Sequence, residues 1–450
     1  MEGKLTKKYG LFTAIAMVVG VVIGSGIFFK TEAVLGASGG SAVIGILALL
    51  IVGAIMIICS YTFSIMAGRY EKVNGLVDYA EAVLGRGYAY YIGWFMSVIY
   101  YPTITSVLVW LSAMYTSQLF GMPDAATSGG TLVIAAFYLV CLVAFNALAP
   151  VLSGRFQVST TVIKLIPLLL MAVVGIIRGV AGGTLLENLT SAGSVTGGGT
   201  GSVLLGACVA MAFSYEGWIV ATTINAELRD ARRTLPRALV LGSLVVVATY
   251  VLYYLGVNGS LTVNELLEHG STQAFINVFG NFMGSLLILF IVISCLGTSN
   301  GLVVACSRGI YSLAARNEGP KPALFAEVDK HTGIPHNSAF FGMVTVGFWL
   351  LYFFGGTMNG WFGPIAFDSS ELPIVTLYAG YIPIFILMMK KEKGLSPVKR
   401  YVMPILAICC CLFMVVAAIV AHGVNILWYL LVFAVIMAIG ALLRGKNRAE

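Results

Sequence analysis

The sequence predicts an all-α integral membrane protein with twelve transmembrane helices, arranged as a five-plus-five inverted repeat followed by two extra C-terminal helices. Of the 450 residues, 59% are hydrophobic and only 10% are charged, and the mean hydropathy is +0.95. A soluble domain carries roughly 25% charged residues, so the composition excludes a soluble enzyme and a nucleic-acid-binding protein. Long apolar runs recur along the whole chain, and two of them contain glycine interruptions at corresponding places.

A membrane-spanning helix needs roughly 20 mostly apolar residues. We expect one domain over residues 1–450, with repeats at 11–178 and 203–390 and the added pair within 401–443. The expected spans are 11–35, 41–67, 88–120, 131–149, 156–177, 203–225, 238–257, 274–305, 338–356, 364–389, 401–421 and 426–443. Three lysines precede the first span, as in a signal peptide, but no small-residue cleavage site follows, so we expect a retained helix.

The basic residues predict the orientation. If the N-terminus is cytoplasmic, the inner segments hold 23 of the 26 Lys and Arg residues, and the outer side keeps only Lys30 and Arg178. Cytoplasmic loops are enriched in basic residues, so both termini are expected in the cytoplasm and the protein in the cell (inner) membrane. The net charge of +7 therefore reflects topology rather than an acidic partner.

Residues of the kinds that support catalysis or metal binding are scattered. The eight cysteines all lie in apolar runs, and no CxxC or zinc-like spacing occurs, so neither disulfides, a metal site nor a cofactor is expected. None of the four histidines has a neighbour that would form a catalytic group, and there is no P-loop. We therefore do not expect an enzyme or an ATP-driven pump.

Two spans are interrupted near their middles. Residues 22–28 read VIGSGIF in the first span, and residues 213–218 read FSYEGW in the sixth, five helices later. Corresponding interruptions in two repeats are typical of helices that unwind at a substrate site. Unwinding frees N–H and C=O groups, which suit the carboxylate and ammonium of a zwitterion. The alternative is that the small residues only allow close helix packing.

These two motifs resemble the L-type amino acid transporter branch of the amino acid–polyamine–organocation superfamily. The loops at 227–237 (ELRDARRTLPR) and 307–320 (SRGIYSLAARNEGP) also match, and the resemblance covers essentially the whole chain. The sequence looks most like the bacterial alanine–serine–cysteine and serine/threonine exchangers of that branch.

The resemblance implies a set of substrate-binding residues. The amides of Ser25, Gly26 and Ile27 would hold the α-carboxylate, and carbonyls of the two interruptions would hold the α-ammonium, with Phe213 closing over the substrate from outside. The full expected set is Val22, Ser25, Gly26, Ile27, Phe213, Ser214 and Glu216. Many family members have glycine or aspartate at the position of Glu216, so side-chain selectivity cannot be transferred.

Lys164 is the one basic residue left inside a span. It lies nine residues beyond Arg155, about 13 Å along a helix that rises about 1.5 Å per residue. Its ammonium could reach back toward the cytoplasmic surface. The resemblance instead implies that it replaces the sodium ion of related transporters, contacting first-span carbonyls near Gly20–Ile23 and the hydroxyl of Thr298 or Ser299.

We therefore expect a sodium-independent exchanger of small neutral L-amino acids (alanine, serine, cysteine) that works by alternating access. A proton-coupled symporter or an amino-acid sensor of the same fold are the alternatives. The loop at 121–130 lacks the cysteine that links animal members to a glycoprotein, so a monomer in the lipid bilayer without a disulfide-linked heavy chain is expected. Tyr100 and Tyr101 are interpreted as packing residues, the alternative being that they line a pathway, and Asp368 and Glu371 are interpreted as solvated residues.

Overall fold

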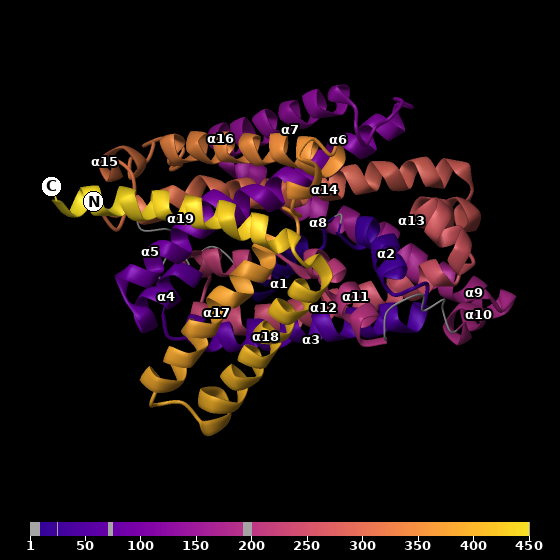
Figure 1. Cartoon of the computed structure of the whole chain (residues 1–450), viewed down its shortest axis with the longest axis horizontal. Helices are drawn as coiled ribbons and strands as arrows, with labels where there is room; N and C mark the ends of the chain where they lie inside the picture. Colours follow the sequence, from indigo (N-terminus) through magenta and orange to yellow (C-terminus); the bar gives the residue numbers. More distant parts are fainter. Residues whose placement is uncertain (1–9, 25, 71–74, 192–199, 450) are drawn as a thin grey trace.

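The computed structural model describes residues 10–24, 26–70, 75–191 and 200–449, which form a bundle of helices joined by turns and short loops (Figure 1). In this part of the chain, eleven helical runs are long and apolar enough to cross a membrane. They are Ala42–Ala67 (α3), Arg86–Leu119, Gly129–Leu148 (α7), Pro150–Gly182, Thr200–Thr222, Ala231–Asn258 (α12), Asn281–Ala314 (α14), His336–Met358, Leu372–Lys391 (α17), Val398–His422 and Asn425–Arg444, the last within α19 (Asn425–Ala449). The protein is thus a multi-pass membrane protein.

Several of these runs are built from shorter pieces. The pieces are α5 (Arg86–Phe95), η1 (Met96–Tyr100), α6 (Tyr101–Leu119), α8 (Pro150–Leu170), η2 (Met171–Gly175), α9 (Ile176–Gly182), α11 (Thr200–Ala212), η3 (Phe213–Tyr215), η4 (Trp218–Glu227), α16 (His336–Tyr352), η5 (Phe353–Met358), η7 (Val398–Val402) and α18 (Met403–His422). The connecting helices are α4 (Leu76–Leu84), α10 (Thr184–Thr190), α13 (Val263–Phe279), α15 (Pro322–Phe325) and η6 (Gly363–Ile365).

The first expected span is divided into two short helices. α1 (Leu11–Val22) and α2 (Gly26–Ala37) together cover the predicted range 11–35. α1 packs against α8, α12 and α14 in the interior, and α2 packs against α11 and α13. The interruption therefore lies inside the bundle.

Two spans begin later than the apolar pattern predicted. The span expected at 274–305 begins at Asn281, because α13 ends before Gly280, whose φ of 87° is a conformation that suits glycine. The span expected at 364–389 begins at Leu372. Here Asp368 accepts hydrogen bonds from the amides of Ser370 and Glu371 at 2.6 and 2.8 Å, which hold a turn before the helix. Apolar residues continue across both turns, so hydropathy alone missed them.

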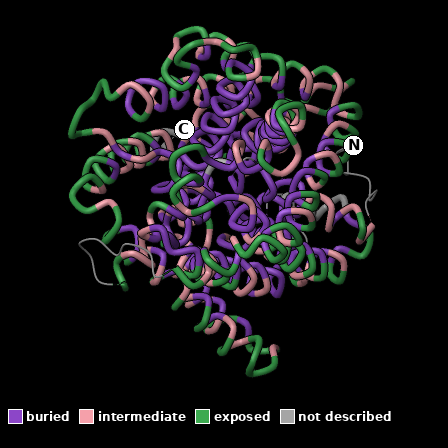
Figure 2. Tube along the Cα trace, turned by 90° about the vertical axis from the view of Figure 1, so that its right-hand side faces the viewer, coloured by how far each residue is buried: buried purple, intermediate pink, exposed green. Residues whose placement is uncertain are grey.

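The bundle is most buried at its centre and most exposed around it (Figure 2), and many of the exposed residues are large and apolar. The run Arg86–Leu119 is buried along nearly all of its length, whereas α19 exposes most of its residues, including Leu431 at 57%. Exposed apolar side chains are compatible with lipid tails, which are as apolar as leucine. The peripheral helices therefore present the lipid-facing surface.

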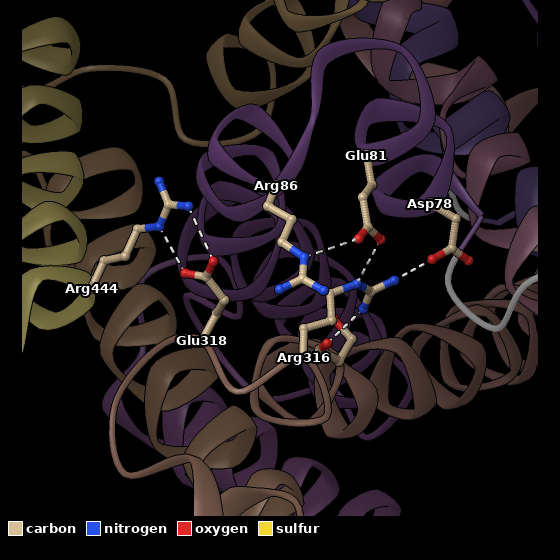
Figure 3. Close-up of polar contacts among 7 residues, drawn as sticks. Asp78, Glu81, Arg86, Arg316, Glu318 and Arg444 are labelled. Atoms are coloured by element: carbon tan, nitrogen blue, oxygen red, sulfur yellow. Dashed lines mark hydrogen bonds and ion pairs between the residues drawn. The ribbon is translucent and has the colours of Figure 1, made fainter. Parts of the chain in front are cut away.

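Ion pairs join α4 to the end of α14 at one end of the bundle (Figure 3). Arg316, just after α14, pairs with Asp78 and with Glu81 of α4. Nearby, Arg444 of α19 donates to both oxygens of Glu318 at 2.7 and 3.1 Å. α3 leads from the side of α2 to α4, so this network lies opposite α2. Following the predicted orientation, we call the α4 end the inner end and the α2 end the outer end.

Candidate functional site

Two helices lose their regular hydrogen bonding at the centre of the bundle. After α1, the backbone of Ile23 is extended, with ψ 94°, before α2 begins. After α11, the short 3-10 turn η3 leads to Glu216, which is also extended, with ψ 163°. Gly217 follows with a φ of 101°, a value that L-residues rarely adopt. Both interruptions fall where the sequence placed glycines within apolar spans.

The two interruptions touch through their glycines. A Cβ atom built on Gly26 would lie 2.6 Å from Ser214 Cα, and one built on Gly217 would lie 2.9 Å from Val21 Cγ1. Real Cβ atoms essentially never approach other atoms so closely. The missing side chains therefore allow the backbones of the two interrupted helices to meet.

A small cavity lies at this meeting point. Its lining residues come from the two interruptions and from α6 and α14, and they are Val21, Val22, Gly24, Gly26, Ile104, Leu108, Phe213, Glu216, Gly217, Thr298 and Leu302. About 310 Å³ of space free of atoms lies among them, of which only a small part is wide enough for a water molecule. The cavity must widen before it can hold a larger guest.

Tyr250 of α12 links the two interruptions. Its hydroxyl lies 3.1 Å from the Val22 carbonyl oxygen and 2.9 Å from the Ser214 carbonyl oxygen. A hydroxyl has one proton, and each carbonyl has two lone pairs, so both carbonyls keep capacity for a further donor. Tyr250 therefore fixes the positions of two acceptors without saturating them.

Glu216 places a carboxyl group on the cavity wall. The residue is only 5% exposed, and Tyr100 donates a hydrogen bond to Oε1. Oε2 has no hydrogen-bond partner among the described residues. Ionisable residues at such depth are costly and are usually functional. Tyr100, interpreted from the sequence as a packing residue, also orients this acid.

Lys164 of α8 lies behind the cavity with its side chain fully buried. The ammonium donates to the Gly20 carbonyl of α1 and to Thr298 Oγ1 of α14, the latter at 3.1 Å. Thr298 in turn lies on the cavity wall. The lysine thus joins α8 to the first interrupted helix and to α14, and its ammonium does not reach the surface.

The predicted site residues occupy different places relative to the cavity. Val22, Gly26, Phe213 and Glu216 line it. Ile27 and Ser214 are buried beside it without being part of its lining, and Ser25 lies outside the described residues. Ser299 is buried, but its hydroxyl has no hydrogen-bond partner in the described part of the chain, whereas Thr298 contacts Lys164.

Sequence reasoning missed two features. Tyr250 is one of several tyrosines of α12, and no spacing rule distinguishes it from Tyr253 or Tyr254. The prediction that Glu371 is solvated is wrong, because the residue is only 7% exposed and pairs with Lys30 at 2.5 Å. Lys30 lies on α2 and Glu371 precedes α17, so only the packing of these helices brings the two charges together.

No set of three His, Cys, Asp or Glu side chains that could hold a metal ion occurs within the described ranges. What the site does contain is backbone N–H and C=O groups released by the interrupted helices, a buried acid and a buried ammonium. This combination can bind a small polar molecule in a water-poor setting, and it includes no nucleophile paired with a base.

Comparison with known proteins adds an independent line of evidence. The family model for amino acid permeases matches residues 9–442. The serine/threonine exchanger SteT of Bacillus subtilis is 30% identical over 335 residues, which cover 73% of this chain and 72% of that protein. The human b(0,+)-type amino acid transporter 1 is 25% identical over 93% of this chain and 83% of its own length. The human large neutral amino acids transporter small subunit 2 is 25% identical over 74% of this chain and 62% of its own length.

Proposed function

We propose that this protein, which belongs to the amino acid permease family, is a sodium-independent exchanger of small neutral L-amino acids such as alanine, serine and cysteine. The resemblance of the chain to L-type transporters, which the motifs predicted, is confirmed by its relatives. The protein works by alternating access. The observation that supports this function most is the meeting of two interrupted helices beside one small cavity. Its relatives include proteins named as exchangers and transporters.

The carboxylate of the substrate binds at the start of α2. The first amides of a helix have no intrahelical acceptors, and the helix dipole favours an anion there. The amides of Gly26 and Ile27, with that of Ser25, supply these donors, and Gly26 lets the ligand approach closely because it has no side chain.

The ammonium of the substrate binds to carbonyls at the end of α1 and in the second interruption. Val22 and Phe213 supply the expected acceptors, and Ser214 and Glu216 lie beside them. Tyr250 holds the Val22 and Ser214 carbonyls at fixed positions, so less ordering has to accompany binding.

The rest of the cavity favours a small neutral side chain. Ile104, Leu108 and Leu302 give it apolar walls, and Phe213 narrows it. An additional negative charge on the substrate would lie near Glu216, and like charges in a poorly solvated site repel strongly. We therefore expect alanine, serine and cysteine to outcompete glutamate, aspartate and bulky amino acids.

Lys164 takes the structural place of a coupling sodium ion. Its ammonium bridges α1, α8 and α14 through Gly20 and Thr298. A permanent cation at this position removes the need for a diffusible one, and so transport should not require a sodium gradient.

A proton-coupled symporter is the second candidate. Glu216 and Lys164 are both ionisable and both buried next to the cavity, and a proton could leave or join either group during the cycle. An amino-acid sensor with this fold is a further alternative, although the described residues form no separate signalling domain.

Transport in proteoliposomes tests the proposal. Vesicles preloaded with alanine and empty vesicles receive labelled alanine outside, with sodium chloride or choline chloride in the buffer. An exchanger takes up label only into preloaded vesicles and equally in both salts. Uptake into empty vesicles driven by a pH gradient would support the symporter, and a strict sodium requirement would refute the proposal.

The same proposal includes the setting of the protein. It functions as a monomer in the cell (inner) membrane, with both termini cytoplasmic and no disulfide-linked heavy chain. The orientation is tested by labelling single cysteines, introduced into the 121–130 loop, from outside intact cells. Non-reducing electrophoresis tests whether a heavy chain is linked to the protein by a disulfide.

A further inference from the structure

A buried ion pair lies at the outer end of the bundle. Lys30 Nζ of α2 and Glu371 Oε1, in the residue before α17, are 2.5 Å apart. Both residues are 7% exposed. Removing one partner of a buried pair leaves a charge without compensation, which is strongly destabilising. The pair therefore connects α2 to the start of α17, and both charges depend on each other for compensation while they are buried.

The ion pair lies next to Phe213, an aromatic residue of the cavity wall. Lys30 Nζ is 5.8 Å from the ring centroid of Phe213, within the range of a cation–π contact. Phe213 lines the cavity on its other side. The ion pair is therefore in contact with a residue of the cavity wall.

Glu371 has a second neighbour, a histidine that is positively charged when protonated and that is not carried by α2. Nε2 of His422, the last residue of α18, is 3.2 Å from Glu371 Oε2. α17 and α18 are consecutive and pack closely together, whereas Lys30 is carried by α2. Movement of α2 away from α17 would thus break the contact with Lys30 and keep the contact with His422.

We propose that Lys30 and Glu371 form a charged outer gate and that His422 retains Glu371 when the gate opens. This inference rests on the proposed transport through the cavity. Protonated His422 attracts Glu371 whether the gate is closed or open, but it repels Lys30, which is close only when the gate is closed. Acid on the outer side therefore favours the open gate. The charged groups that face His422 are Glu371 and Asp368 before α17, and Lys30 on α2.

Accessibility of the cavity from outside tests the gate without any substrate. Leu108, which lines the cavity, is replaced by cysteine in the full-length protein, and a membrane-impermeant methanethiosulfonate reagent is added to intact cells. The rate is corrected with the same protein lacking the new cysteine, because eight native cysteines are present. We compare Lys30→Ala, Glu371→Gln and the matched control Arg69→Ala, which breaks another ion pair, with Glu392, at the inner end.

The gate predicts that Lys30→Ala and Glu371→Gln each raise the modification rate of Leu108→Cys at least five-fold, while Arg69→Ala does not. Lys30→Arg and the charge exchange Lys30→Glu with Glu371→Lys should return the rate to within two-fold of the unaltered pair. Unchanged rates in both single variants, or an equal rise with Arg69→Ala, would overturn the proposal. A variant that fails to reach the membrane is replaced by Lys30→Gln.

The role of His422 has its own readout. Lowering the external pH from 8 to 5.5 should raise the modification rate in the protein with all three groups intact, because protonation of His422 adds a positive charge that repels Lys30. The charge of the reagent does not change with pH. The modification rate is divided by the rate measured for a fully exposed cysteine, which removes the effect of pH on the ionisation of the thiol. A pH dependence that persists in His422→Gln would overturn this part.

The two proposals fail in different ways. If the wild-type protein exchanges no amino acid but the labelling results hold, the proposed substrate is wrong and the gate stands. If exchange occurs and the labelling rates do not respond to Lys30 or Glu371, the gate alone is wrong.

Discussion

Replacement of Gly26 should abolish transport without unfolding the protein. In Gly26→Ala the new Cβ would lie 2.6 Å from Ser214 Cα and 3.0 Å from Ser214 Oγ, whereas ordinary contacts begin at 3.4 Å. The closest atom belongs to the backbone, so no rotamer change can relieve the overlap, and the two interruptions must move apart. Overpacking of this kind typically costs 1–3 kcal/mol of stability, which a large bundle tolerates.

The cost to transport is larger than the cost to stability. Displacement of about 1 Å at a binding site can reduce a rate by about 100-fold, and Gly26→Val adds two further methyl groups. Exchange of labelled alanine is measured per amount of protein in the vesicles, and thermal unfolding is measured in detergent. Gly206→Ala on α11 is the matched control, since a Cβ there meets no atom within 4 Å. Exchange by Gly26→Val within two-fold of the unaltered protein would refute the reasoning and leave the glycine as a packing residue.

Three further substitutions test the other groups of the site. Lys164→Ala should lower exchange by at least ten-fold or make it asymmetric between the two sides, since the bridge between Gly20 and Thr298 is lost; equal, unchanged exchange from both sides would contradict the assigned role. Glu216→Gln keeps the shape and the contact with Tyr100 but removes the charge, so the rate or its pH profile should change; an unaltered rate together with an unaltered pH profile means that the acid has no role in transport. Tyr250→Phe should raise the KM for every substrate about ten-fold, the equivalent of about 1.4 kcal/mol, whereas Tyr254→Phe, whose hydroxyl has no hydrogen-bond partner within the described residues, should not; equal effects of both variants would show that the loss is structural.

The sequence predicted the fold class and the places of both interruptions because those features depend on local composition. A glycine within an apolar span and a carboxylate at mid-span are visible without knowledge of any contact. The boundaries of two spans were less accurate. Gly280 and the turn at Asp368 end or delay helices inside continuous apolar sequence, and hydropathy does not register a change of backbone direction.

The amino-acid sequence by itself therefore determined the membrane-embedded helical fold, the family and the residues that would unwind. These features depend on hydrophobicity, on glycines and on a buried charge, and each of these can be recognised at one position or in a short stretch of sequence. Only the tertiary structure decided which groups meet. Tyr250 reaches two carbonyls from interruptions far apart in the chain, and Lys30 lies against Glu371 and not in water. These contacts depend on the packing and rotation of separate helices, and a residue's sequence position carries no information about either until the bundle has assembled.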